Sequence, residues 1–306
     1  MSMSQAPNEK GSVSKSKAQV FGARLFSTLL LWAIVTGVFL SGNAWAFIGL
    51  IILLAAFSLW EFFQMTRIGG MPSQPKWGVL VGLTYLFSLG ILLGSGGRDA
   101  LDQLWLFDVL FIAVLLIGGL LIQLRKPVEG KNTITEVAVT VLGFLYVPVL
   151  FSFLARLLFL PEGADAVPGA WLMIWVIAVT KFTDMGAYIT GSLIGKHKMI
   201  PHISPAKTWE GFFGALFFAQ LAGCGLFALM PDSLSILHSW IWVIGLGILL
   251  ALLAVVGDLA ESVLKRSIGT KDSGNTLPGI GGALDLIDSI CFTAPALYFI
   301  LIWLNA

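Results

Sequence analysis

Long apolar runs recur along this chain, and they constrain its fold more than any other feature. A helix needs about 20 apolar residues to cross the hydrocarbon core of a bilayer. Such runs occupy 20–40, 44–63, 77–93, 104–124, 137–160, 170–194, 209–230, 236–256 and 287–303. Only 11% of the 306 residues are charged, whereas soluble domains carry about a quarter. The sequence therefore predicts an all-α, polytopic transmembrane helix bundle of about nine spans.

Basic residues are concentrated in every second loop of this arrangement. After the lysines of the N-terminal tail they are Arg67, Lys76, Arg125, Lys126, Lys131, Lys196, Lys198, Lys207, Lys265, Arg266 and Lys271. Loops rich in lysine and arginine face the cytoplasm. We therefore expect a cytoplasmic N-terminus and, with an odd number of spans, an external C-terminus. The expected location is the cytoplasmic (inner) membrane of a bacterium.

The first 19 residues differ from the rest of the chain. Residues 1–19 are polar and rich in serine and lysine, which predicts a disordered basic tail. Residues 20–306 are predicted to form a single transmembrane domain. The formal net charge is only +1, so the lipid bilayer is an expected partner and nucleic acid is not. The sequence does not set the number of subunits, and a homodimer is one option.

Ionisable residues inside a span are candidates for function, because charge in lipid is costly. Lys181 and Asp184 lie in the middle of the 170–194 run. They are three residues apart and can pair on one helix face. They fit either a structural ion pair or a polar cavity reached from the cytoplasm. Glu61 and Arg156 lie near the ends of their runs, where we expect their side chains to reach the membrane surface.

Three carboxylates stand where predicted spans meet the cytoplasm. Asp258 follows the 236–256 run, and Asp285 and Asp288 lie at the start of the last run. Residues three apart share one helix face, so Asp285 and Asp288 can converge on one or two cations. Oxygen ligands suit Mg²⁺, which is held by one or two carboxylates together with substrate phosphates. The pattern predicts a magnesium site formed by Asp258, Asp285 and Asp288.

Cationic side chains lie between these acids. Lys265, Arg266 and Lys271 are followed by a turn rich in glycine and proline, 278–282. Lysine and arginine neutralise a polyphosphate, and glycines let backbone N–H groups approach phosphate closely. Together with a metal, these are the parts that phosphoryl or nucleotidyl transfer needs.

A second polar cluster occupies 196–210. Ser204 begins a turn into the 209–230 run, and Thr208 is a plausible N-terminal cap for that helix. Lys207 and the helix N-terminus would favour an anion. By physical arguments alone, this second cluster is a weaker signal than the first.

At these clusters the sequence resembles the phosphatidate cytidylyltransferases, also called CDP-diacylglycerol synthases. The residues that match the family signature with correct spacing are Ser262, Lys265, Arg266, Lys271, Asp272, Pro278, Gly281, Gly282, Asp285 and Asp288. The segments SPAKTWEG at 204–211 and DMGAY at 184–188 are also similar to the family. The likeness covers about 175–289, which we expect to be the catalytic half. Ile280 and Leu286 stand where the family has His and Arg.

The resemblance implies transfer of CMP from CTP to phosphatidate, or a related lipid phosphate, giving CDP-diacylglycerol and pyrophosphate in phospholipid biosynthesis. It implies catalytic roles for Lys265, Arg266, Lys271, Asp285 and Asp288. Substrate contacts are expected for Lys207, Ser204, Ser262, Asp272, Gly281, Gly282, Lys181 and Asp184. A phosphate monoester is already largely dianionic at neutral pH, so no general base is required.

Three other functions stay open at this point. A CTP-dependent isoprenoid-alcohol kinase would need a base and would move the γ-phosphate instead of the α-phosphate. A cation-coupled transporter could use Lys181, Asp184 and Asp258, but it would leave the cytoplasmic signature unexplained. A non-catalytic relative is conceivable because Ile280 and Leu286 replace polar residues. We expect an active enzyme in which other contacts replace the lost ones, or whose lipid acid differs from phosphatidate.

Overall fold

The computed structural model describes residues 30, 33–161, 169–270, 273–274 and 281–304. Its α-helices are α2 (Ala44–Ile68), α3 (Pro75–Gly96), α4 (Leu104–Gln123), α5 (Lys131–Phe144), α6 (Leu150–Phe159), α7 (Ala170–Ile194), α8 (Trp209–Leu229), α9 (Trp240–Ser267), α10 (Ala283–Ile287) and α11 (Ile290–Leu304). Short 3₁₀ or π-helical turns are η1 (Gly97–Gln103), η2 (Leu145–Val149) and η3 (Ser235–Leu237). The tail 1–19 lies outside the described residues, and its disorder stays a prediction.

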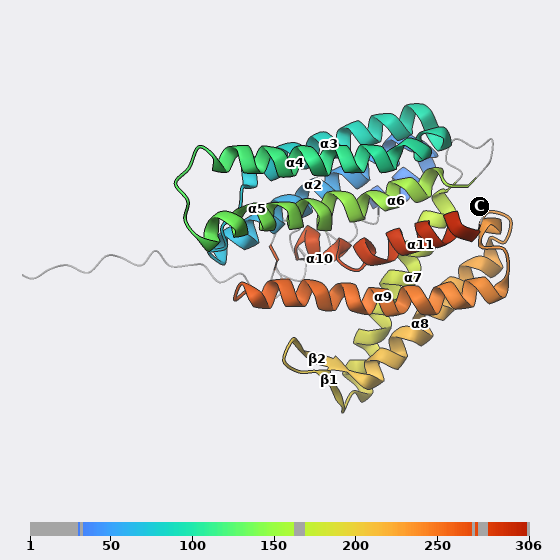
Figure 1. Cartoon of the computed structure of the whole chain (residues 1–306). Helices are drawn as coiled ribbons and strands as arrows, with labels where there is room; N and C mark the ends of the chain where they lie inside the picture. Colours follow the sequence, from blue (N-terminus) through green and yellow to red (C-terminus); the bar gives the residue numbers. More distant parts are fainter. Residues whose placement is uncertain (1–29, 31–32, 162–168, 271–272, 275–280, 305–306) are drawn as a thin grey trace, which may run out of the picture.

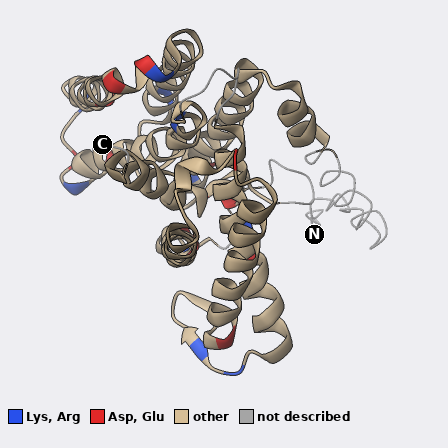
Figure 2. Ribbon diagram, turned by 90° about the vertical axis from the view of Figure 1, so that its right-hand side faces the viewer, with Lys and Arg blue, Asp and Glu red and all other residues tan. Residues whose placement is uncertain are grey.

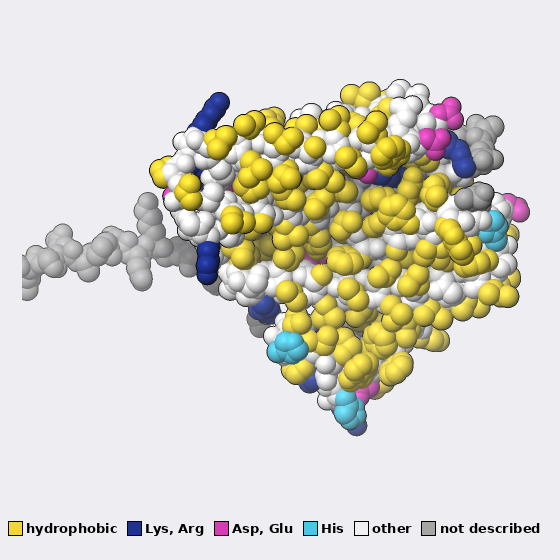
Figure 3. Space-filling model, viewed as in Figure 1, with side chains coloured by type: hydrophobic (Ala, Val, Ile, Leu, Met, Phe, Trp, Pro, Cys, Tyr) yellow, Lys and Arg dark blue, Asp and Glu magenta, His cyan; other side chains and the backbone are white. Residues whose placement is uncertain are grey.

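The helices form a bundle whose outer surface is apolar. Most of them run along a common direction, and α7 and α8 are inclined to it (Figure 1). Charged residues occupy only short stretches of the ribbon (Figure 2). Apolar side chains cover most of the face shown in Figure 3, with charged side chains mainly near its edges. Helices that are apolar also on their outer surface are typical of proteins embedded in lipid, and we conclude that this is an integral membrane protein.

Within the described part of the chain, seven helical stretches are long and apolar enough to cross a membrane. One of them, Pro75–Gln123, consists of α3, η1 and α4, and its two long helices lie side by side in contact (Figure 1). The first predicted run, 20–40, lies mostly outside the described residues. The helical bundle is therefore confirmed, whereas the count of nine spans and the orientation of the N-terminus stay predictions.

Two helices near the C-terminus differ from the predicted spans. Helix α9 continues to Ser267, well past the predicted end at residue 256. Its last turns stay helical although they are polar, because Glu261 and Lys265 pair at i and i+4. The last span is divided, since α10 ends at Ile287 and α11 begins at Ile290. Asp288 lies in the break between them.

The segment between α7 and α8 is an antiparallel hairpin, where a turn was predicted at Ser204. Strand β1 (Lys198–Ile200) pairs with β2 (Ser204–Thr208). This small sheet is an exception to the all-α prediction. Thr208 caps α8 as predicted, since its hydroxyl accepts the Gly211 N–H at 3.2 Å. Strand β2 therefore leads directly into α8 and lies in contact with α7.

Arg156 forms a buried polar network, so the prediction that it reaches the membrane surface is wrong. The residue is only 3% exposed. Its guanidinium lies 2.7 Å from Asp108 Oδ1 and donates to the Tyr85 hydroxyl at 2.9 Å. It also lies over the Phe153 ring, 4.3 Å from the ring centroid. These contacts join α3, α4 and α6.

Removing one member of this network should destabilise the bundle. Arg156→Met leaves the Asp108 carboxylate without its cation, and breaking a buried ion pair in this way costs about 3 kcal/mol or more. We expect a clear fall in the temperature of thermal unfolding in detergent. The double variant Asp108→Leu/Arg156→Met removes both charges and should regain most of that loss. Equal unfolding temperatures for wild type and Arg156→Met would contradict a stabilising role for the pair.

Candidate active site

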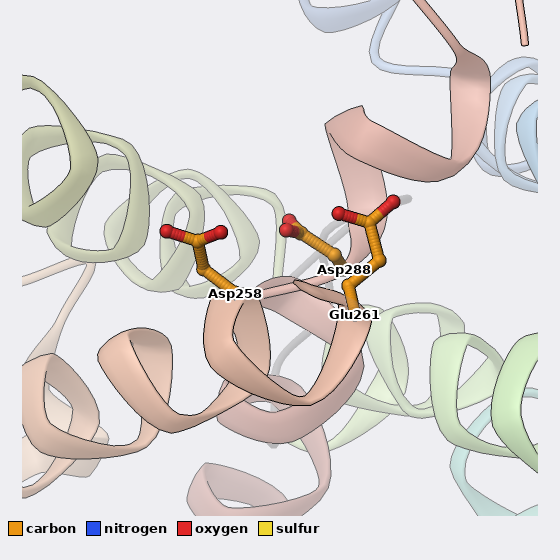
Figure 4. Close-up of side chains that lie close together, drawn as sticks. All are labelled: Asp258, Glu261 and Asp288. Atoms are coloured by element: carbon orange, nitrogen blue, oxygen red, sulfur yellow. The ribbon is translucent and has the colours of Figure 1, made fainter. Parts of the chain in front are cut away.

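Three carboxylates from α9 and from the α10–α11 break lie together inside the bundle. One carboxylate oxygen from each of Asp258, Glu261 and Asp288 lies within 4.8 Å of the other two. Figure 4 shows the three side chains converging, with Asp288 between the other two in that view. Glu261 and Asp288 are almost completely buried, at 1% and 5% exposed. We call this group the carboxylate trio.

The trio has the composition that a divalent cation requires. Three negative charges this close repel one another unless a positive charge lies between or beside them. Glu261 Oε1 is buried and accepts no hydrogen bond from the described residues, so one oxygen is left for another ligand. Carboxylate oxygens are the ligands that Mg²⁺ prefers. The residues present therefore fit such an ion.

Lys265 connects the trio to the start of α10. Its ammonium lies 2.6 Å from Glu261 Oε2 and 3.0 Å from Asp285 Oδ1. The second oxygen of Asp285 accepts the Gly282 N–H at 3.0 Å. Asp285 is therefore paired with Lys265. The carboxylate trio contains Glu261, whereas the sequence predicted Asp285 in that place. Asp288, at the C-terminal end of α10, lies in the trio, whereas the side chain of Asp285 pairs with Lys265.

A pocket of about 460 Å³ opens beside the trio, between the hairpin, α7, α8 and α9. Asp258 reaches it from α9, Asp184 from α7, and Ser204 and Lys207 from β2. Lys207 Nζ lies 2.9 Å from Asp258 Oδ2. The structure therefore joins the two polar clusters of the sequence in one site.

The predicted pair in the middle of α7 also lies at this site. Lys181 Nζ is 3.3 Å from Asp184 Oδ2, and both side chains are about one-third exposed. Asp184 lines the pocket. The two interpretations made from the sequence, an ion pair and a polar cavity, are therefore compatible.

The other residues singled out in the sequence differ in exposure, and some lie outside the described part of the chain. Arg266 is exposed, with no ion pair to any described residue. Ser262 lies one turn after Asp258 on α9 and is partly buried. Leu286 is partly buried and packs against the hydrophobic core. Lys271, Asp272 and Ile280 lie outside the described residues.

Backbone conformation explains one glycine of the signature, and close packing explains another. Gly281 has a φ of +121°, which side chains rarely tolerate. A Cβ atom on Gly282 would lie 2.1 Å from the Ser273 hydroxyl and 2.8 Å from Glu61 Oε2. A side chain at position 282 would therefore displace both of these groups.

Two acidic residues of the site were not predicted. Glu261 follows Asp258 at i+3, the same spacing as Asp285 and Asp288. A predicted helix that continued past residue 256 would have placed Glu261 on the same face as Asp258. Glu61 was expected at the surface, yet it is 2% exposed. A carboxylate in an apolar run was its only signal in the sequence.

Comparison with known proteins identifies the family of the chain. The model of the cytidylyltransferase family matches residues 22–304. Proteins named phosphatidate cytidylyltransferase are similar to the chain in three bacteria. The Mycobacterium bovis protein is 37% identical over 224 residues, which are 72% of this chain and 67% of that protein. For Mycobacterium tuberculosis the identity is also 37%, over 62% of that protein. The Staphylococcus saprophyticus protein is 32% identical over 83% of this chain and 91% of its own length. The chain therefore belongs to the cytidylyltransferase family.

Proposed function

We propose that this enzyme transfers a cytidylyl group from CTP to phosphatidate, giving CDP-diacylglycerol and pyrophosphate. The observation that carries the proposal is the carboxylate trio beside a lysine-lined pocket, in a chain that belongs to the cytidylyltransferase family. Nucleotidyl transfer needs cations around a polyphosphate and an acidic site for a metal. Both are present within one part of the bundle.

The reaction joins a lipid phosphate to the α-phosphorus of CTP. An oxygen of the phosphatidate monoester forms the new bond, and the bond to the β-phosphate oxygen breaks, so pyrophosphate leaves. The monoester is largely dianionic at neutral pH and needs no base. Lys207 in the pocket neutralises one of the phosphates, and Lys271 beyond α9 is proposed to hold the triphosphate. Lipid tails would lie against the apolar pocket wall, which includes Tyr188 and Phe212.

The carboxylate trio is the proposed magnesium site. Mg²⁺ held by Asp258, Glu261 and Asp288 would stabilise negative charge on the phosphates during transfer. Lys265 keeps Glu261 and Asp285 in place through its two ion pairs. Asp258 belongs to the trio and also pairs with Lys207, so it links the proposed metal to the substrate pocket.

The position of the label in CTP distinguishes this reaction from the kinase alternative. Purified protein in detergent should be given Mg²⁺ and CTP labelled at either the α- or the γ-phosphate, with phosphatidate, another lipid phosphate or an isoprenoid alcohol in separate assays. We expect the α-label in lipid and the γ-label in pyrophosphate. A γ-label in an isoprenoid alcohol would instead identify a kinase, and no transfer to any lipid acid would identify a non-catalytic relative.

The site is proposed to face the cytoplasm, where CTP is found. A cysteine at exposed Lys196, beside the hairpin, should then be protected from an impermeant thiol reagent in intact cells, whereas one at exposed Asp99 on η1 should react. Because Cys224 is partly exposed, the background should carry Cys224→Ala. Reversed labelling would place the site on the outer face and would contradict the use of cytoplasmic CTP.

A further inference from the structure

Glu61 is a buried carboxylate far from the family signature in sequence. It belongs to α2, yet it lies beside Gly274 and the signature glycine Gly282. Burying a carboxylate is costly unless hydrogen bonds compensate for the lost water. The hydrogen bonds of Glu61 therefore indicate the role of this buried carboxylate.

One hydrogen-bond partner of Glu61 lies at the start of α10. Glu61 Oε2 accepts the Leu284 N–H at 2.9 Å. The first N–H groups of a helix have no partner within that helix, so Glu61 satisfies one that would otherwise be buried without a hydrogen bond. Leu284 is itself fully buried, which excludes water as a simple replacement.

The same carboxylate lies close to the backbone at Gly274 and at Gly282. A Cβ atom on Gly274 would be 2.6 Å from Glu61 Oε1, and one on Gly282 would be 2.8 Å from Oε2. The backbone at these two glycines can approach the carboxylate because neither residue has a side chain. Helices α2 and α10 are also in contact with each other.

Helix α10 in turn sets the positions of two acidic side chains. Asp285 reaches Lys265 from its middle, and Asp288 enters the carboxylate trio directly after its end. A shift of this five-residue helix would move both carboxylates together.

We propose that Glu61 is a positioning residue that anchors the start of α10 and thereby places Asp288 in the carboxylate trio. The proposal deepens the proposed function, because it assigns the N-terminal half of the chain a part in forming the catalytic site. Glu61 itself does not belong to the trio and has no role in the transfer step.

The test measures divalent-ion binding, which does not depend on turnover. Mn²⁺ serves as the probe with purified wild type, Glu61→Ala, Glu61→Gln and Ser58→Ala. Ser58 is a matched control, because it is buried on the same helix and its hydroxyl donates to Leu54 O within α2. Loss of a residue that orients metal ligands typically weakens metal binding about 10–100-fold.

We expect Glu61→Ala to weaken Mn²⁺ binding about 10-fold or more, and Glu61→Gln, which keeps an accepting oxygen, to restore most of it. Ser58→Ala should bind as wild type does. Wild-type affinity in Glu61→Ala would overturn the proposal, as would an equal loss in Ser58→Ala.

A second variant covers the case in which Glu61→Ala does not fold. Gly282→Ala would push against Glu61 Oε2 and the Ser273 hydroxyl, and it should weaken Mn²⁺ binding in the same way. Wild-type affinity in Gly282→Ala would then overturn the proposal. A wild type that binds Mn²⁺ but transfers no cytidylyl group would count against the proposed function alone, so the two failures are distinguishable.

Discussion

Asp288→Asn should reduce the rate of cytidylyl transfer by about 10³-fold, because electrostatic stabilisation of the transition state is usually the largest part of catalysis. The substitution keeps the shape of the side chain and removes one of the three charges that would hold Mg²⁺. Asp288 Oδ1 accepts the N–H of Ser289 in the α10–α11 break, and asparagine can do the same. The measurement is kcat with saturating CTP, phosphatidate and Mg²⁺.

The control for this substitution is Asp232→Asn. Asp232 is exposed, in the segment between α8 and α9 and outside the site, so the same chemical change should leave kcat unchanged. Thermal unfolding in detergent should be similar in wild type and both variants. Turnover near the wild-type value in Asp288→Asn would remove Asp288 from the metal site.

The adjacent cations Lys265 and Arg266 should respond differently to alanine. Lys265 is largely buried between Glu261 and Asp285, so Lys265→Ala leaves two close carboxylates without their cation. We expect kcat/KM for CTP to fall by about 10²-fold or more, the loss that removing one preorganised electrostatic group from an active site typically causes. The measurement is initial rates over a range of CTP concentrations.

Arg266→Ala is the matched comparison, because Arg266 is exposed. Its removal should raise KM for CTP by about 10-fold at most, the loss of one charge-assisted contact to phosphate, and leave kcat near the wild-type value. Equal effects of the two substitutions on kcat would contradict the claim that buried Lys265 and exposed Arg266 have different roles.

The sequence predicted the positions of the spans better than their ends. Apolar runs are recognised because transfer into lipid depends on composition. Helix α9 nevertheless continues past its apolar run to Ser267, because Glu261 and Lys265 pair along it. Because the predicted span ended at residue 256, Asp258 and Glu261 were not recognised as neighbours on one helix face.

Contacts between distant segments could be predicted only in part. The family signature and the SPAKTWEG segment both indicated a phosphate site, and the ion pair of Lys207 with Asp258 brings them together. Nothing local in the sequence indicates that Glu61 meets Leu284. That contact depends on which helices pack together, and helix packing is not encoded in the spacing of one segment.

The claim that Asp258, Glu261 and Asp288 form one divalent-ion site is tested most directly by ion binding to Glu261→Gln. The substitution removes the buried carboxylate whose Oε1 has no partner among the described residues, and Glu129→Gln makes the same change at an exposed position between α4 and α5. The account predicts a Kd for Mn²⁺ about 10-fold or more higher in Glu261→Gln, with Glu129→Gln unchanged from wild type. A wild-type Kd in Glu261→Gln would contradict it.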